Sequence, residues 1–243
     1  MDIVQDRKDD WESEQYPFNL NAVKSWNRLA LHENVTFLVG ENGAGKSTLI
    51  EAIAIAAGFN PEGGSKNFNF ATDESHSPLS KHIRLSRGTK RNKDGYFLRA
   101  ESYFNVATQI NKLDAEPAPG PPIIDSYGGV SLHEQSHGES FMSLMMNRFR
   151  GDGFYVLDEP EAALSPQRQF AFLSRLHDLV RDGSQFVIAT HSPILMACPN
   201  AWIYELQNSG PLRAEWENVE HVDTTRQFLK HPENFLRILL EDE

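Results

Sequence analysis

The sequence predicts an α/β protein with a mainly parallel sheet flanked by helices. Three apolar runs carry this prediction, at residues 35–39, 154–157 and 185–190, and each is long enough for one buried strand. Strands of a parallel sheet are covered on both faces, so they are apolar throughout. The first two runs are followed by patterns typical of helices. The 243 residues can form one sizeable core, and we expect a single domain over 1–243 with loop-rich insertions at about 60–95 and 114–130.

Charge and cysteine content limit the classes of protein. The formal net charge of −11 argues against a surface that binds nucleic acid everywhere, although a local basic patch could do so. The single cysteine, Cys198, cannot form an internal disulfide. The first residues lack the apolar segment of a secretory signal, and every apolar run is too short to span a bilayer. We therefore expect a cytoplasmic protein without direct membrane insertion.

A glycine-rich segment follows the first strand. Residues 40–48 fit the phosphate-binding template G-x-x-x-x-G-K-[ST], between the strand 35–39 and a helix predicted over 47–57. Glycines turn the backbone N–H groups inward, and the helix N-terminus adds a positive dipole end. A nucleoside triphosphate is the expected ligand, with Lys46 on its β and γ phosphates and the Ser47 hydroxyl on Mg²⁺. The predicted nucleotide contacts are Gly40, Asn42, Gly43, Ala44, Gly45, Lys46, Ser47 and Thr48.

Two acidic residues end the second strand. Asp158 and Glu159 follow the run 154–157, which places them at the carboxyl edge of the sheet, where open α/β folds bind ligands. Neighbouring residues of a strand face opposite sides, so the two acids should have different roles. We expect Asp158 to hold Mg²⁺ and Glu159 to accept a proton from the water that attacks the γ-phosphate.

The segment between these two centres carries a family resemblance. Residues 135–140, QSHGES, are similar to the L-S-G-G-Q signature of the ATP-binding-cassette (ABC) ATPases: Ser136 and Gly138 match, whereas His137 and Glu139 depart from it. The chain resembles the stand-alone branch related to chromosome-maintenance and recombination-repair ATPases. Residues 161–166 resemble the D-loop of that family, with Ser165 in place of the usual aspartate.

The resemblance assigns two further site residues. His191, directly after the run 185–190, matches the switch histidine, which contacts the γ-phosphate and is counted with Glu159 and Lys46 as catalytic. Glu101 stands where the family has a glutamine. Beside Mg²⁺ it could bind the metal or orient water; otherwise it is an ordinary acid at a strand end.

The resemblance also implies a mechanism. Two copies pair head to tail with ATP between them, the phosphate loop of one facing Ser136 and Gly138 of the other, and hydrolysis reopens the pair. The predicted function is a Mg²⁺-dependent ATPase that drives a conformational cycle on a protein or nucleic-acid partner. The alternatives are the ATP-binding subunit of a membrane transporter and a slowly hydrolysing dimerisation switch.

The remaining predictions concern supporting structure. Residues 2–14 are expected to be a loose arm and 16–20 an entry strand, where Tyr16, Phe18 or Trp26 could stack on adenine or simply pack in the core. The cations between Lys81 and Lys93 could bind nucleic acid, an acidic partner or a phosphate, or belong to a solvated loop. We also predict strands at 96–102, 201–206 and 212–216, helices at 103–113, 139–149, 166–181, 224–230 and 232–240, and a loop at 115–129. The apolar residues of the last two helices are expected to pack on the core or on a second subunit.

Overall fold

A six-stranded sheet forms the centre of the protein. The computed structural model describes all residues except 8–10, 67–76, 89–91, 101–102, 117–119 and 241–243. In spatial order the strands are β5 (Asp94–Arg99), β6 (Gly153–Asp158), β7 (Gln185–Ala189), β3 (Val35–Val39), β8 (Ala201–Gln207) and β9 (Gly210–Ala214). The first five are parallel, and β9 pairs antiparallel with β8 at one edge. The predicted α/β class with a mainly parallel sheet is confirmed.

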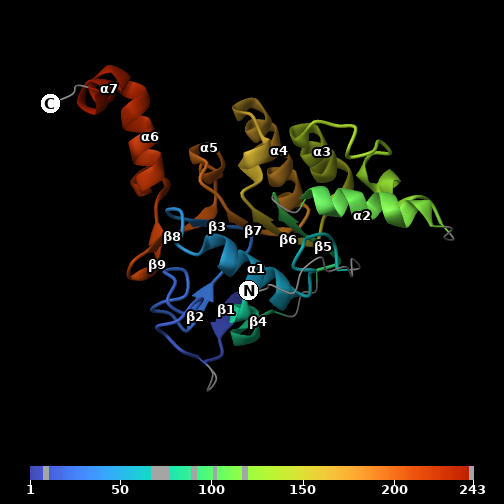
Figure 1. The fold of residues 1–243 in the computed structure, drawn as a ribbon, viewed down its shortest axis with the longest axis horizontal. Coiled ribbons are helices and arrows are strands. Elements are labelled where there is room, and N and C mark those ends of the chain that lie inside the picture. Colours follow the sequence, from blue (N-terminus) through green and yellow to red (C-terminus); the bar gives the residue numbers. More distant parts are fainter. Residues whose placement is uncertain (8–10, 67–76, 89–91, 101–102, 117–119, 241–243) are drawn as a thin grey trace.

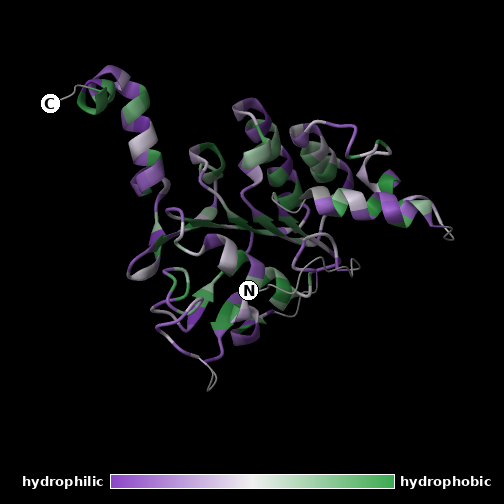
Figure 2. Ribbon diagram, in the orientation of Figure 1, coloured by the Kyte–Doolittle hydropathy of each residue, from purple (hydrophilic) through white to green (hydrophobic). Residues whose placement is uncertain are grey.

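Helices cover both faces of this sheet (Figure 1). One face carries α1 (Lys46–Ala57), and the other carries α2 (Tyr103–Ala115), α3 (His137–Ser143), α4 (Pro166–Arg181) and α5 (Pro193–Met196). Strand β3 explains why the sheet needs both layers. All five of its residues are buried; Val35, Phe37 and Val39 join the core under α4, while Leu38 joins the core under α1. Figure 2 shows the same apolar character along the central strands.

A small antiparallel sheet lies next to α1 and corrects two predictions. It consists of β1 (Asp2–Gln5) between β2 (Arg28–Ala30) and β4 (Ile83–Ser86). The loose arm predicted at 2–14 is therefore wrong over its first residues, because Ile3 and Gln5 are buried between two segments far away in the sequence. The entry strand predicted at 16–20 is also wrong: this segment forms turns, and its continuation packs on residues 44–45.

The segment between α2 and β6 is more ordered than predicted. The expected loop at 115–129 contains a short 3₁₀ helix, η2 (Ile123–Tyr127), whose first N–H groups donate to the Asp114 carboxylate. The helix expected at 139–149 consists of α3 followed by a π-helical turn, η3 (Leu144–Arg148). Its predicted apolar side is confirmed as buried: Phe141, Leu144, Met145 and Phe149. Two further short 3₁₀ helices lie outside this segment: η1 (Pro78–His82) precedes β4, and η4 (Pro160–Ala163) follows β6.

The C-terminal part forms an arm that extends away from the sheet (Figure 1). After η5 (Trp216–Asn218) come α6 (Glu220–Lys230) and α7 (Pro232–Leu240). Val219 and Val222 are buried in the core, which fixes the start of α6. Leu229, Ile238, Leu239 and Leu240 are each more than 70% exposed, so the predicted packing of this arm on the core of its own chain is wrong. Among the described residues, no helix is both long and apolar enough to cross a membrane.

The core under α4 provides a test of this packing. Phe172 is fully buried and its ring centroid lies 5.9 Å from that of Phe141. We expect Phe172→Ala to lower the free energy of unfolding by about 3–5 kcal/mol, because the side chain is lost and a cavity remains. Phe170→Ala is the matched control: Phe170 is on the same helix and 60% exposed, so its loss should cost less than about 0.5 kcal/mol. Urea unfolding followed by circular dichroism measures both, and equal losses would contradict the assignment.

Candidate functional site

The glycine-rich loop connects β3 to α1, as predicted. Its last glycine, Gly45, has φ +94°, and a Cβ there would lie 3.0 Å from the Cβ of Leu20 and 3.1 Å from that of Ala22. Both the left-handed backbone and the close approach require glycine at this position. The N–H of Ala22 also donates to the Ala44 carbonyl at 2.9 Å. The turns at 16–25 therefore pack against the loop and help to fix its conformation.

Lys46 begins α1 with its side chain inside the loop. It is 5% exposed, and its ammonium donates to the carbonyl oxygens of Gly40 at 3.0 Å and Glu41 at 3.1 Å. Burial lowers the pKa of Lys46, and nearby carboxylates, Glu159 first among them, oppose this effect. These partners keep the ammonium within the phosphate loop, where a triphosphate would be bound.

Ser47 and Asp158 meet at the carboxyl edge of the sheet. The Ser47 hydroxyl donates to Asp158 Oδ1 at 3.2 Å, and Asp158 is 5% exposed. Among the described residues, no cluster of three or more His, Cys, Asp or Glu side chains could hold a metal by itself. One hydroxyl and one carboxylate do suit Mg²⁺, which in nucleotide sites binds one or two protein oxygens together with phosphates and water. The pair thus fits the predicted Mg²⁺ ligands.

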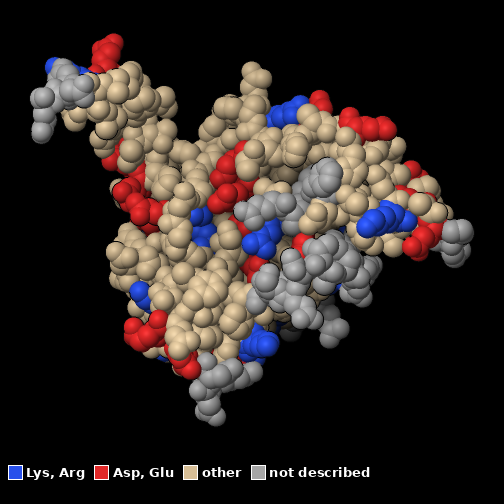
Figure 3. Space-filling view, viewed as in Figure 1, with Lys and Arg blue, Asp and Glu red and all other residues tan. Residues whose placement is uncertain are grey.

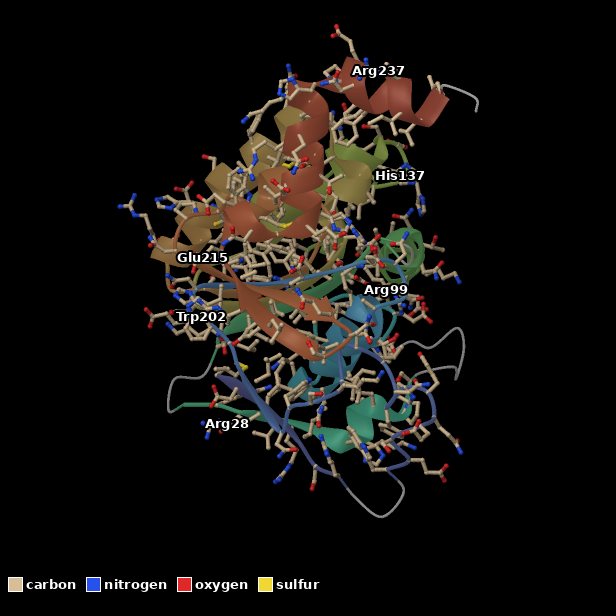
Figure 4. The ribbon with its side chains drawn as sticks, turned by 90° about the vertical axis from the view of Figure 1, so that its left-hand side faces the viewer. Arg28, Arg99, His137, Trp202, Glu215 and Arg237 are labelled. Atoms are coloured by element: carbon tan, nitrogen blue, oxygen red, sulfur yellow. The ribbon has the colours of Figure 1, made fainter. Side chains whose placement is uncertain are left out.

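Arg99 is a charged neighbour of Asp158 that the sequence analysis missed. It ends β5 in register with Asp158, and its Nε lies 3.9 Å from Asp158 Oδ2. Its Nη1 donates to Glu51 Oε2 at 2.7 Å, so the guanidinium lies between two carboxylates. In Figure 4, Arg99 and His137 lie on the same side of the molecule. The residues on either side of Arg99 share a small cavity of about 120 Å³ with His137.

Glu159 and His191 face each other across neighbouring strand ends. Glu159 Oε1 lies 3.5 Å from His191 Nε2, and the Glu159 side chain is 41% exposed. Glu159 has φ +50°, a left-handed conformation that is uncommon outside glycine, and its N–H donates to the Ala189 carbonyl at 3.0 Å. The buried Asp158 and the accessible Glu159 therefore occupy different environments, in keeping with the two roles predicted for them.

His191 is held by two residues that the sequence analysis did not assign to the site. Its N–H donates to Glu161 Oε1 at 2.6 Å, and its Nδ1 lies 3.1 Å from Nε2 of His221, in the first turn of α6. Burial lowers the pKa of His191, and the neighbouring Lys46 and His221 lower it further. Glu161 is only two residues beyond Glu159, and this proximity in sequence could have indicated a role in the site. No sequence feature indicated a role for His221, because it lies in a segment without a motif.

An open pocket of about 610 Å³ lies beside the phosphate loop, a volume within the range of small-molecule sites. It is lined by Asn21, by residues 40–44 of the loop, by residues 205–209 at the turn between β8 and β9, and by Glu220 and His221. Both the loop and the start of α6 therefore border the same space.

Of the three aromatic candidates for the adenine ring, one is accessible. Phe18 and Trp26 are less than 10% exposed and belong to the core under α1. Tyr16 is 61% exposed, and its hydroxyl lies 3.4 Å from the Thr48 hydroxyl. Core packing, the alternative expected from sequence, is thus confirmed for Phe18 and Trp26 and wrong for Tyr16.

The signature residues lie at the junction of α3 and α4. Ser136 caps α3, and its backbone N–H donates to Glu139 at 3.0 Å in a reciprocal capping box. Glu139 thus has a local structural role at the start of α3. Gly138 is buried, and a Cβ there would lie 2.6 Å from the Ala163 carbonyl oxygen and 2.2 Å from a guanidinium nitrogen of Arg168. Glycine is thus needed at this position for the packing of α3 on α4.

Two other predicted features fall partly outside the described residues. Glu101 lies outside them, and so do Lys90 and Arg91 of the basic segment. In the rest of that segment, Arg84 lies 3.5 Å from Asp6 and Lys93 lies 2.9 Å from Asp152. On the face drawn in Figure 3, Lys and Arg are interspersed with Asp and Glu. That face therefore presents no continuous basic patch over the described residues.

Two family models match the chain. One, described as an AAA domain, matches residues 18–118, and the other, described as "AAA domain, putative AbiEii toxin, Type IV TA system", matches residues 125–197. The first range contains the phosphate loop. The second contains Asp158, Glu159 and His191, which the fold brings to the same edge. The protein is an ATPase.

Known proteins similar to this ATPase include ABC proteins. The cytochrome c biogenesis ATP-binding export protein CcmA of Rhodopseudomonas palustris (strain BisB5) is 28% identical over 169 residues, which are 66% of this chain and 79% of that protein. The dimeric structure of MJ0796, a bacterial ABC transporter cassette, is 18% identical with a TM-score of 0.45, over 77% of this chain and 88% of that one. The family models and CcmA support an ATPase of the ABC/AAA type.

Glu161 offers a test of how His191 is held. Burial raises the pKa of Glu161 above its ordinary value of 4.5, against the effect of the hydrogen bond from His191. The folded-state pKa lies above the unfolded one. The contribution of this carboxyl to the free energy of unfolding therefore falls as pH rises above 4.5. Glu161→Gln keeps an acceptor without the charge, so its free energy of unfolding should rise relative to wild type between pH 5 and pH 7.

Glu161→Ala is the matched comparison. It leaves the partly buried N–H of His191 without its acceptor, which should cost about 1–3 kcal/mol relative to Glu161→Gln at both pH values. Urea unfolding of the three proteins measures these differences. A Gln variant as unstable as the Ala variant would contradict the role of Glu161 as an acceptor.

Proposed function

We propose that the protein is a Mg²⁺-dependent ATPase that hydrolyses ATP at the interface of a head-to-tail homodimer and drives a conformational cycle on a protein or nucleic-acid partner in the cytoplasm. Residues 1–243 act in it as one ABC-type ATPase domain. The observation that carries this proposal is the convergence of Lys46, the Ser47 and Asp158 pair, and the Glu159 and His191 pair at one edge of the sheet.

Each group has a distinct task. The N–H groups of the loop and Lys46 bind the β and γ phosphates, and Tyr16 stacks on adenine from its exposed position beside Thr48. Ser47 and Asp158 would hold Mg²⁺, with Glu101 as a further candidate ligand. When bound there, the metal would supply positive charge against that of the phosphate oxygens.

Glu159 and His191 act on the reacting atoms. Glu159 is partly exposed and can accept the proton of the attacking water, whereas Asp158 is enclosed beside Ser47. His191, whose pKa is lowered by burial, is neutral near pH 7 and can donate one hydrogen bond to the γ-phosphate. The two carboxylates thus divide metal binding and base catalysis between them.

Pairing of two copies would complete the site. The 41% exposure of the Glu159 side chain leaves the candidate base open to water in the single chain. In the proposed dimer, Ser136 and Gly138 of one copy face the phosphate loop of the other, as in the family that the signature resembles. This supports ATP-dependent dimerisation, and we assign the chain to the stand-alone recombination-repair and chromosome-maintenance branch.

A transporter subunit is the second candidate function. It is favoured by the similarity to CcmA, whose name describes an ATP-binding export protein. The altered signature and the glutamate at position 101 favour a stand-alone ATPase. Copurification of the full chain with a membrane protein would support the transporter candidate.

Steady-state phosphate release separates an enzyme from a dimerisation switch. The assay uses the full chain with Mg²⁺ and ATP, with and without DNA or RNA. We expect continuous turnover of at least about one ATP per second, the low end of typical enzymes. A single turnover followed by a stable ATP-bound dimer would instead identify the slow switch, and stimulation by nucleic acid would identify the class of partner.

Lys46→Ala tests the phosphate-binding role of the loop. Loss of a charged hydrogen-bond donor should weaken ATP binding by about 100-fold, measured by calorimetry. Lys112→Ala, on the exposed side of α2, is the matched control and should bind ATP as wild type does. Undiminished ATP affinity of Lys46→Ala would rule out Lys46 as the phosphate ligand.

Glu159→Gln tests both the base and the dimer. The amide cannot accept the proton of water, so hydrolysis should fall by about 100-fold or more while ATP binding remains. ATP-bound dimers should then accumulate, which size-exclusion chromatography with light scattering detects. Glu33→Gln, an exposed acid just before β3 and so at the opposite edge of the sheet, serves as the control. Monomers with rapid turnover would refute the roles of both Glu159 and the dimer.

A further inference from the structure

His221 reaches the site from the C-terminal arm. Its Nε2 lies 3.1 Å from Nδ1 of His191, and the two ring centroids are 5.0 Å apart. The start of α6 is fixed in place, because the N–H of Glu220 donates to Glu205 Oε1 at 3.1 Å and Val222 is buried in the core. His221 is therefore presented to His191 by an anchored helical turn.

The contact with His221 matters because a neutral His191 carries only one ring proton, on one of its two nitrogens. Burial and the neighbouring Lys46 lower its pKa, so the ring is neutral near pH 7 and carries one N–H. Its Nε2 is buried, lies 3.5 Å from Glu159 Oε1 and makes no hydrogen bond with the described residues. To donate to a phosphoryl oxygen from this side, His191 must carry its proton on Nε2.

In that tautomer, Nδ1 of His191 can only accept a hydrogen bond. With the proton on Nε2, Nδ1 of His191 is an acceptor, and the group opposite it must be a donor. His221 meets this requirement when its own proton is on Nε2. If the proton of His191 were on Nδ1, its Nε2 would face the Glu159 carboxylate as a second acceptor, which is unfavourable. The contacts on the two sides of the ring thus favour the same tautomer.

We propose that His221 is a positioning residue for hydrolysis: it donates from Nε2 to Nδ1 of His191 and so keeps the His191 proton on Nε2, facing Glu159 and the γ-phosphate. This deepens the proposed function and rests on it. His221 does not touch the reacting atoms. It acts by fixing the tautomer and the ring orientation of the residue that does.

The first experiment separates catalysis from binding. In His221→Ala, kcat for ATP hydrolysis should fall by about 10-fold to 100-fold, as is typical for partners that orient metal-binding histidines, while the Kd for ATP stays unchanged. His221→Gln should recover most of the rate, because its amide nitrogen can donate from a similar position. His231→Ala, at the exposed end of the same helix, is the matched control.

A double-mutant cycle tests whether His221 acts through His191. Once His191 is replaced by Ala, adding His221→Ala should change kcat by less than about 2-fold, because the residue to be positioned is gone. An equal loss in both backgrounds would mean a general structural effect and overturn the proposal. So would a rise in Kd with unchanged kcat, since His221 would then bind nucleotide directly in the adjoining pocket.

The ring protons provide a readout that does not depend on turnover. In ¹⁵N spectra of the full chain, His191 should show a protonated Nε2 and an unprotonated Nδ1, and His221→Ala should introduce the other tautomer. An Nδ1-protonated His191 in the wild type would overturn the proposal even in an active enzyme. Failure of the wild type to hydrolyse ATP, with the expected spectrum, would instead contradict the proposed function alone.

Discussion

The site depends on the parallel register of four neighbouring strands. Asp158 on β6 is paired with Arg99 on β5 and with Ala189 on β7, and Ala189 is paired with Leu38 on β3. Because the strands run the same way, their carboxyl ends lie at one edge, and the loop after β3, the acids after β6 and the histidine after β7 meet there. The order of these strands in space thus joins three distant segments into one site.

The electrostatics of the site follow from partial burial. Four ionisable residues lie on the same edge: Lys46, Asp158, Glu161 and His191. Desolvation lowers the pKa of Lys46 and of His191 and raises that of Glu161. Asp158 remains beside Ser47 and Arg99, whereas Glu159 reaches solvent. Chemically similar carboxylates therefore have different partners: one lies where a metal fits, one where water enters, and one holds the backbone of His191.

Sequence reasoning succeeded where a local pattern sufficed. The helix α4 was predicted with its observed bounds from the proline that begins it. Sequence reasoning failed where contacts with distant segments determine the local structure. Ile3 and Gln5 are too few to reveal a strand until β2 and β4 flank them, and residues 16–20 form turns because residues 44–45 of the phosphate loop pack against residues 20–22. In the site, Arg99 and His221 were missed for the same reason, whereas Glu161 lies two residues beyond Glu159 and could have been found from the sequence.

By itself, the sequence determined the parallel α/β class, the phosphate loop, the acidic pair and the histidine at a strand end, because each depends on residue type and spacing over a few positions. Only the tertiary structure decided which partners these residues have. The close approach of Gly138 to Ala163 and the contact of His221 with His191 depend on how whole elements pack. Such contacts join residues far apart in the chain, and no local pattern encodes their distance in space.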